Sequence, residues 1–145
     1  ILDQVQEALD SHKPGEIDWI TFVGSGETTL HSGLGQMIQG VKAMTDLPVA
    51  VITNGSLLYQ ADLRSELKLT NAVLPTLDAG NAELYRKINR PHPQFTFERL
   101  VQGMIALRKE YDNFLWLEVM LVQGLNDSEE SLAEIASWIE KIKPD

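Results

Sequence analysis

The sequence contains no cysteine among its 145 residues. Disulfide bonds, thiolate metal ligands and cysteine nucleophiles are therefore excluded within these residues. Long apolar runs are missing too, because every hydrophobic stretch is far shorter than the roughly 20 residues of a membrane-spanning helix. The first residues, 1–4, carry neither the basic segment nor the apolar core of a secretory signal. These absences predict a soluble cytoplasmic protein without a membrane partner.

Positive charge is scarce, since 12 lysines and arginines stand against 21 acidic residues and give a net charge of −9. A nucleic-acid-binding protein needs a basic surface that displaces counterions from phosphates, so a nucleic-acid partner is not expected. His12 and His31 have no histidine or carboxylate partner at ligand spacing, and no metal site is predicted within the chain. The hydrophobic share of 43% is that of a globular protein.

Short apolar runs alternate with helical patterns along the chain. The predicted strands are residues 19–23, 49–52, 72–77 and 115–122. Between them, apolar residues recur every three or four positions, which is the spacing of one helix face. Pro75 weakens the third strand, because proline removes a hydrogen-bond donor from a sheet. Asp127 is the predicted N-cap of the last helix, with Glu130 as its capping-box partner.

Four strands that alternate with helices predict an α/β fold with a parallel sheet. Two architectures satisfy this pattern, an open doubly wound sheet and a segment of a (β/α) barrel. The chain begins inside a helical pattern and stops after another one. Four strands between such ends favour a partial TIM-like (β/α) barrel, a single domain over residues 1–145 that is truncated at both ends. Its open strand edges predict self-association through unpaired backbone groups.

In both architectures, ligands bind beyond the carboxyl ends of the parallel strands. Small and polar residues follow each predicted strand, in segments 24–30, 53–56, 76–81 and 123–127. Turns and helix caps use the same residue types, so each segment taken alone is also explained as a connector. The recurrence of such residues at all four strand ends favours a binding site assembled from them.

The turn Gly24-Ser25-Gly26 before Glu27 allows two ligand chemistries. Glycine-rich turns cradle phosphates at helix N-termini, but the third glycine of a dinucleotide fingerprint and the Lys-Ser/Thr of a P-loop are missing. A cationic group such as an α-ammonium fits Glu27 better, since a carboxylate attracts it. Glu27 could also be a first-turn acid favoured by the helix dipole. A β/α enzyme that binds a phosphorylated metabolite at Gly24–Gly26 and a non-catalytic scaffold stay open as alternatives.

The ordered set of strand-end motifs resembles that of the radical S-adenosylmethionine (radical SAM) superfamily. Residues 25–30 are similar to the Gly-Gly-Glu-Pro motif after the second family strand, with Thr28 at the proline position. Residues 53–55 resemble the end of the third strand, 77–79 that of the fourth, and 123–127 the turn after the fifth. The branch that includes tRNA-wybutosine-type and glycyl-radical activating enzymes is the most similar.

The resemblance implies an enzyme that reductively cleaves S-adenosylmethionine at a 4Fe–4S cluster. The 5′-deoxyadenosyl radical would then abstract hydrogen from a substrate, which the sequence does not identify. The implied cofactor contacts are Ser25, Gly26 and Glu27 at the methionine amino group, Thr53 and Asn54 at the sulfonium end, Thr76 and Asp78 at the ribose, and Met120, Val122 and Asn126 at the adenine.

The three-cysteine loop that holds the cluster in this family is absent. In the family this loop precedes the first helix, so we expect it upstream in the parent protein and expect this chain alone to be inactive. Glu118 is either an inward-facing contact or a solvated side chain. Arg90 and His92 belong either to a substrate-recognition loop or to a rigid connector.

Overall fold

Four parallel strands stand side by side in the order of the sequence, β1-β2-β3-β4. They are β1 (Ile20–Phe22), β2 (Val49–Thr53), β3 (Ala72–Pro75) and β4 (Phe114–Leu115). The computed structural model describes all residues from 1 to 145. Every neighbouring pair of strands is parallel, with registers such as Val51 opposite Val73. The predicted parallel α/β sheet is therefore confirmed.

Helices precede, connect and follow these strands. They are α1 (Leu2–Ser11), the single 3₁₀ turn η1 (Thr28–Leu30), α2 (Leu34–Met44), α3 (Ala61–Leu67), α4 (Ala82–Asn89), α5 (Phe97–Glu110) and α6 (Glu129–Ile142). None of them is both long and apolar enough to cross a membrane.

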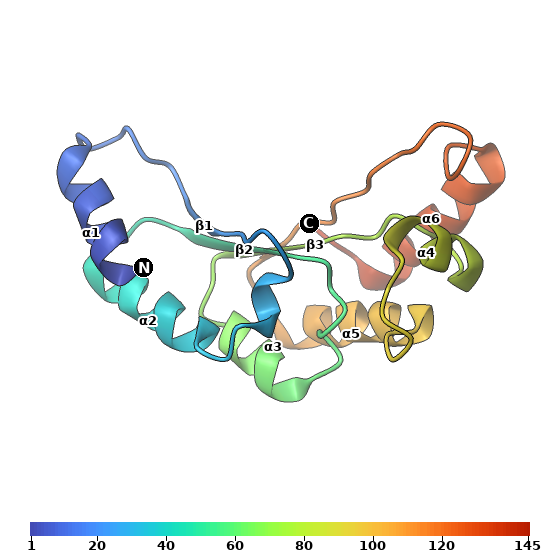
Figure 1. Cartoon of the computed structure of the whole chain (residues 1–145), viewed down its shortest axis with the longest axis horizontal. Coiled ribbons are helices and arrows are strands. Elements are labelled where there is room, and N and C mark those ends of the chain that lie inside the picture. Colours follow the sequence, from blue (N-terminus) through green and yellow to red (C-terminus); the bar gives the residue numbers. More distant parts are fainter.

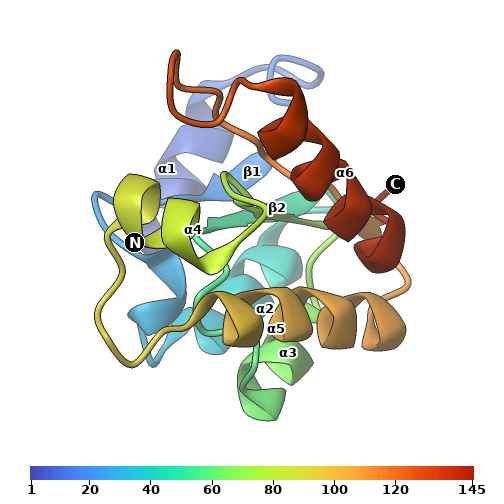
Figure 2. The same cartoon turned by 90° about the vertical axis from the view of Figure 1, so that its right-hand side faces the viewer.

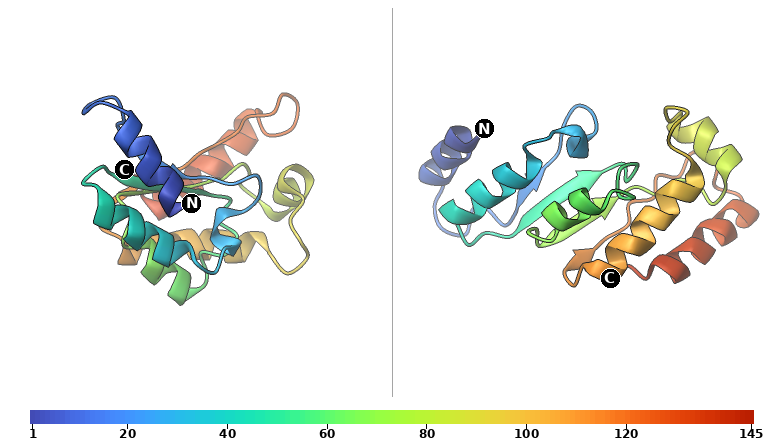
Figure 3. Two further views of the ribbon diagram at one scale, coloured as in Figure 1. Left: turned by 60° about the vertical axis from the view of Figure 1, so that its left-hand side comes forward. Right: turned by 90° about the horizontal axis from the view of Figure 1, so that it is seen from below.

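Helices α2, α3 and α5, which link successive strands, lie on one side of the sheet. Figure 1 shows α2, α3 and α5 below the strands, and Figure 3 shows α1 and α6 continuing this row at its two ends. Figure 2 shows the same layers from the side. A doubly wound sheet would carry helices on both faces. The structure is therefore a partial (β/α) barrel whose inner face has no such helix layer, as the sequence favoured.

The core lies between the sheet and this row of helices. Val51 and Val73 point from the strands into it and are completely buried. They meet equally buried side chains of the helices, among them Ile38 and Met104. Each such side chain contributes about 1.5–3 kcal/mol by leaving water. This packing fixes the strands and thereby the edge where their carboxyl ends meet.

The strand predicted over residues 115–122 is wrong in length, because β4 ends at Leu115. The cause lies in β3. The carbonyl of Val73 accepts from Trp116 N at 3.1 Å and that of Pro75 from Glu118 N at 3.0 Å, so Pro75 faces this neighbour. Proline has no N–H to donate back, and one rung of the ladder is missing. An isolated bridge between Thr76 and Glu118 resumes the pairing beyond the gap.

The N-cap predicted at Asp127 is wrong by one residue. Helix α6 begins after Ser128, whose side chain accepts a hydrogen bond from Ser131 N. The Asp127 carboxylate instead accepts from Gly124 N at 2.8 Å. Gly124 adopts a positive φ of 74°, and the turn that it makes directs its N–H toward Asp127. The capping box with Glu130 is therefore not formed.

Asp145, the last residue of the chain, is hydrogen-bonded to the outer edge of strand β4. Asp145 N donates to Leu115 O at 3.0 Å, and the Asp145 carboxylate accepts from Leu115 N at 2.9 Å. The same carboxylate pairs with Arg108 at 2.8 Å. These contacts hold the end of the chain beside strand β4.

Candidate functional site

The segments after β1, β2 and β3 meet at one edge of the sheet, as parallel strands require. Glu27 comes from the loop after β1, Thr53 ends β2, and Asn54 follows it. Thr76 and Asp78 follow β3. The structure joins these predicted residues into two clusters, one around Glu27 and one around Asp78.

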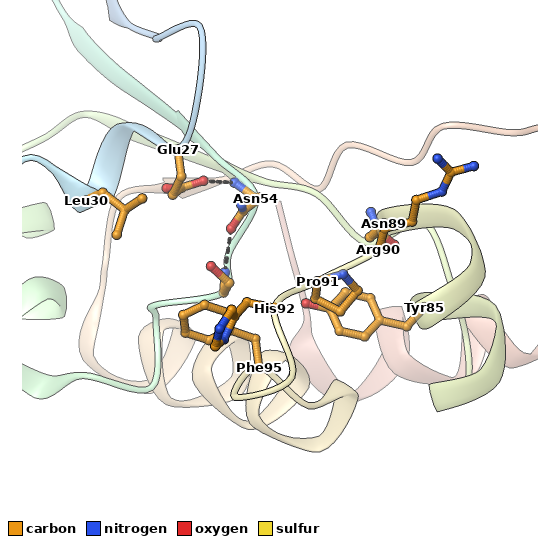
Figure 4. Close-up of a pocket in the computed structure, with 10 residues that line it drawn as sticks. Glu27, Leu30, Asn54, Tyr85, Asn89, Arg90, Pro91, His92 and Phe95 are labelled. Atoms are coloured by element: carbon orange, nitrogen blue, oxygen red, sulfur yellow. Dashed lines mark hydrogen bonds between the residues drawn. The ribbon is translucent and has the colours of Figure 1, made fainter.

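Glu27 connects the first two strand ends through its carboxylate. Its Oε1 accepts hydrogen bonds from Thr29 N at 3.0 Å, from Thr29 Oγ1 at 2.5 Å and from Thr53 Oγ1 at 2.5 Å. Its Oε2 accepts only from Asn54 N, at 2.7 Å (Figure 4). A carboxylate oxygen has about two acceptor positions, so Oε2 keeps capacity for one more donor.

The sequence builds this cluster locally on each side. Glu27 is the N-cap of η1, which orients its side chain toward the turn. Thr53 is 3% exposed at the end of β2, and its hydroxyl also accepts from Gly55 N at 3.1 Å. The Asn54 side chain closes a turn by accepting from Ser56 N at 2.9 Å. The carboxylate of Glu27 is thus fixed by contacts on two segments.

Ser25 and Gly26 directly precede Glu27 in the chain. Both residues are exposed, and a side chain added at Gly26 would meet nothing within 4 Å. The turn is followed by the short η1, and helix α2 begins only at Leu34. The glycine turn therefore does not lead directly into the N-terminus of an α-helix, which is the arrangement that a phosphate cradle uses.

Asp78 joins three segments at the other end of the edge. It is 4% exposed, its Oδ1 accepts from Met120 N at 2.8 Å, and its Oδ2 accepts from Asn89 Nδ2 at 2.8 Å. Its backbone carbonyl accepts from Asn126 Nδ2 at 2.7 Å. The carboxylate therefore anchors the segment after β4 and the end of α4. The predicted contact with a ribose stays a prediction.

Asn126 is completely buried, and its side chain forms all of its hydrogen bonds with the protein backbone. Its amide also donates to Met120 O at 2.8 Å, and its Oδ1 accepts from Val122 N at 2.6 Å. These bonds shape the segment 120–122, in which Met120 is 50% exposed. Of the three residues predicted beside an adenine, Asn126 holds the segment and Met120 offers the accessible surface.

Glu118 lies on the inner face of the sheet and is exposed to solvent. Thr76 Oγ1 donates to its carboxylate at 3.3 Å. The alternating neighbours Trp116 and Met120 are also exposed, whereas Leu117 and Val119 pack against the core. Glu118 therefore faces the inner side of the sheet but is solvated and not buried, and its contact with a cofactor or substrate stays a prediction.

A cavity of about 280 Å³ opens beside Glu27. Figure 4 shows Glu27 and Leu30 at one end and Tyr85 and Arg90 at the other. Its lining consists of Glu27, Leu30, Asn54, Ser56, Tyr85, Asn89, Arg90, Pro91, His92 and Phe95. Three of these ten residues are hydrophobic. The cavity therefore lies at the carboxyl ends of the strands, where ligands bind in such folds, and most of its lining residues are polar.

Residues 1–136 match the family model of the radical SAM superfamily. The chain belongs to this superfamily. The resemblance read from the strand-end motifs is thereby confirmed.

The radical SAM chain is similar to longer curated proteins. A protein of Brachyspira hyodysenteriae named GTPase Obg is 44% identical over 145 residues, which are 100% of this chain and 21% of that protein. A UPF0026 protein of Methanocaldococcus jannaschii is 31% identical over 144 residues, 99% of this chain and 44% of that protein. The chain thus spans less than half the length of these relatives.

Solved structures of radical SAM proteins share the fold. A domain of pyruvate-formate lyase-activating enzyme from Bacteroides vulgatus has a TM-score of 0.68 at 18% identity, covering 83% of this chain and 70% of that one. SuiB of Streptococcus suis, bound to S-adenosylmethionine, has a TM-score of 0.74 at 13% identity, covering 99% of this chain and 32% of that one. The partial barrel predicted from the sequence is therefore confirmed as the fold of radical SAM proteins.

The sequence placed Ser56 in the strand-end segment 53–56 but did not identify Tyr85 and Phe95 as residues of the pocket in this radical SAM chain. Tyr85 lies at an apolar position of α4, where the helical pattern indicates a core residue. It is indeed 5% exposed, and this burial raises the pKa of its phenol, which stays protonated at neutral pH.

The radical SAM chain does not supply ligands for a 4Fe–4S cluster. It contains no cysteine, and it has no group of three or more His, Asp or Glu side chains placed to hold a metal ion. Thiolates are the usual ligands of such clusters. By contrast, the Glu27 carboxylate and the polar pocket suit a small ligand with a cationic group.

Proposed function

We propose that this chain binds S-adenosylmethionine, with the ammonium group of its methionine end on Oε2 of Glu27. The carboxylate is held by four hydrogen bonds from Thr29, Thr53 and Asn54, and Oε2 accepts only one of them. A charge-assisted hydrogen bond from an ammonium group would complete its acceptor capacity. This prepared carboxylate is the observation that carries the proposal.

The remaining contacts of the cofactor follow the same edge of the sheet. Ser25 and Gly26 would lie against its amino group, and Asn54 beside its sulfonium. Thr76 and Asp78 would meet the ribose, and Met120 and Val122 would offer apolar surface to the adenine. The 50% exposure of Met120 supports such a contact. The fold shared with SuiB, whose structure contains S-adenosylmethionine, supports this cofactor as the ligand.

The whole protein, in this proposal, is a radical SAM enzyme. A 4Fe–4S cluster held by residues other than these 145 would allow reductive cleavage of the cofactor and hydrogen abstraction from the substrate by a 5′-deoxyadenosyl radical. The chain by itself has no thiolate for a cluster. We therefore expect these residues to bind S-adenosylmethionine without cleaving it.

The proposal is tested by calorimetric titration of the chain with S-adenosylmethionine and, separately, with 5′-methylthioadenosine, which lacks the amino-acid end. Glu27→Gln should weaken S-adenosylmethionine binding about tenfold or more, because it removes a charge-assisted hydrogen bond. It should leave 5′-methylthioadenosine binding unchanged. Glutamine keeps the size of the side chain and one acceptor oxygen, so the turn around η1 should be retained.

Glu130→Gln is the matched control, since it removes one negative charge from an exposed site at the start of α6. It should bind both ligands as the wild type does. Unchanged S-adenosylmethionine affinity in Glu27→Gln, with the fold verified by thermal unfolding, would remove Glu27 from the site and contradict the proposal.

A further inference from the structure

Two hydroxyl groups of the pocket have no protein partner, that of Tyr85 at the end opposite Glu27 and that of Ser56 beside Asn54. Tyr85 is 5% exposed and Ser56 is 8% exposed, and neither hydroxyl makes a hydrogen bond within the chain. Neither is sealed off, since the only fully buried side-chain polar atom without a partner is Nε of Arg64. Buried hydroxyls are normally hydrogen-bonded. Both hydroxyls line the pocket, so a ligand there can accept the hydrogen bond that each of them does not donate to the protein.

The loop after α4 is held in place at this end. Asn89 Nδ2 donates to Asp78 Oδ2 at 2.8 Å, which fixes the start of the loop to the end of β3. Arg90 then adopts the left-handed conformation, with φ 47° and ψ 51°, at a position where helices usually place glycine. Keeping an arginine there costs backbone energy, so its side chain is a candidate for function.

Arg90 has no acidic partner, although the chain has an excess of acidic residues. The ion pairs of the protein join Arg64 and Lys68 to Glu110, and Arg108 to Asp145. In Figure 4 the guanidinium group of Arg90 extends away from Tyr85 and His92 into open space. Because this side chain is exposed and lines the pocket, the guanidinium can turn toward Tyr85 and take a carboxylate or a phosphate in bidentate fashion.

His92 adds another donor to this end of the pocket. Its Nδ1 is the acceptor of a long hydrogen bond from Gln94 N, at 3.4 Å, so in the neutral ring the proton is on Nε2. The ring packs edge-on against Phe95, with 6.1 Å between the centroids. Tyr85, Arg90 and His92 thus offer hydrogen-bond donors to the pocket, whereas the carboxylate of Glu27 lies at the end opposite Tyr85 and Arg90.

We propose that the pocket end formed by Tyr85, Arg90 and His92 binds an oxyanion group, a carboxylate or a phosphate, of the substrate. This inference rests on the proposed function, because it places the substrate beside the methionine end of S-adenosylmethionine. Donors without partners, an unpaired guanidinium and distance from Glu27 all select an anionic group. The substrate class is therefore a small molecule or a group with an acidic oxygen function.

The test uses the isotope-labelled chain without S-adenosylmethionine, titrated with inorganic phosphate and separately with acetate while amide signals are followed by NMR. At least one anion should shift the signals of residues 85–92. Tyr85→Phe and Arg90→Gln should each weaken that binding about tenfold, as expected for one hydrogen bond to a charged group. Lys87→Gln removes the same charge from the same helix outside the pocket and should bind as the wild type does.

A calorimetric titration with S-adenosylmethionine separates the two possible sources of the anion. Tyr85→Phe and Arg90→Gln should keep wild-type affinity for the cofactor. If they lose it, this end holds the carboxylate of the cofactor and the inference is overturned. It is also overturned if neither anion shifts residues 85–92, or if Lys87→Gln weakens binding equally. A wild-type chain that does not bind S-adenosylmethionine would instead contradict the proposed function, independently of the anion titration.

Discussion

Replacing Thr53 by valine removes one hydroxyl from the centre of the Glu27 cluster and preserves the shape of the side chain. The hydroxyl donates to Glu27 Oε1 at 2.5 Å, and such a bond to a charged group is worth about 1.5–3 kcal/mol. It also accepts from the buried Gly55 N, whose unpaired N–H would cost about 1–3 kcal/mol. The added methyl group returns about 1 kcal/mol. We expect a net loss of about 3 kcal/mol in the free energy of unfolding.

Urea denaturation measures this loss directly. With a slope of about 2 kcal/mol per molar, the midpoint of Thr53→Val should fall by about 1.5 M while the slope stays constant. Thr53→Ser keeps the hydroxyl and loses one methyl group, so it should cost only about 1 kcal/mol. If the valine variant changes stability by less than about 0.5 kcal/mol, or the serine variant costs as much as valine, the hydrogen bonds of Thr53 do not hold the cluster.

Two further perturbations test the surroundings of the site. In Gly80→Ala the new methyl group would overlap the Cβ of Glu134 and lie 2.8 Å from the backbone carbonyl carbon of Glu134, so α6 must shift. This overpacking should lower the urea midpoint by an amount equivalent to about 3 kcal/mol. The hydrogen bond from Leu115 N, with Arg108 nearby, holds the pKa of Asp145 below its ordinary value of 3.8. A depressed pKa contributes stability above pH 3.8 that is lost as the pH falls through the pKa of the folded state. The free energy of unfolding should therefore decline below about pH 4, and Asp145→Asn should make this decline smaller.

Each of these perturbations has a matched control. A methyl group added at Gly26 meets nothing within 4 Å, so Gly26→Ala should leave the urea midpoint within about 0.5 kcal/mol of the wild type. A Gly80→Ala variant as stable as this control would show that α6 does not press on the loop after β3. Asp112→Asn removes an exposed carboxylate near the same strand. If Asp112→Asn reduced the loss of stability below about pH 4 as much as Asp145→Asn does, the pKa of Asp145 would not be the cause of that loss.

Local patterns were sufficient to predict most of the fold. Apolar residues at helical spacing were expected between the first two strands, and α2 at Leu34–Met44 occupies this segment, because such spacing is a property of one segment. Strand β2, at Val49–Thr53, was equally clear from a continuous apolar run. The length of β4 was not predictable in this way. It depends on Pro75, which lies on the neighbouring strand and removes a hydrogen bond that only the paired structure defines.

The site was predicted as a set of residues but not as a set of contacts. Glu27, Thr53 and Asn54 were identified from motifs at two strand ends. That the Thr53 hydroxyl and the Asn54 N–H both point at the Glu27 carboxylate follows from the register of β1 and β2. Tyr85 was not found, because its position in the helical pattern is that of a core residue. Only the structure reveals that its hydroxyl reaches a pocket.

Remaining hydrogen-bond capacity separates the polar residues of this edge into supports and ligand contacts. Asn126 uses both amide protons and its oxygen within the protein, and it is completely buried. Such a residue fixes the loop that carries Met120, and a substitution there should act first on folding. Glu27 keeps an acceptor on Oε2, and Tyr85 keeps its hydroxyl, so substitutions at these two positions should act first on binding. Polar residues at strand ends therefore acquire different roles according to what the fold leaves unsatisfied, which a motif alone does not specify.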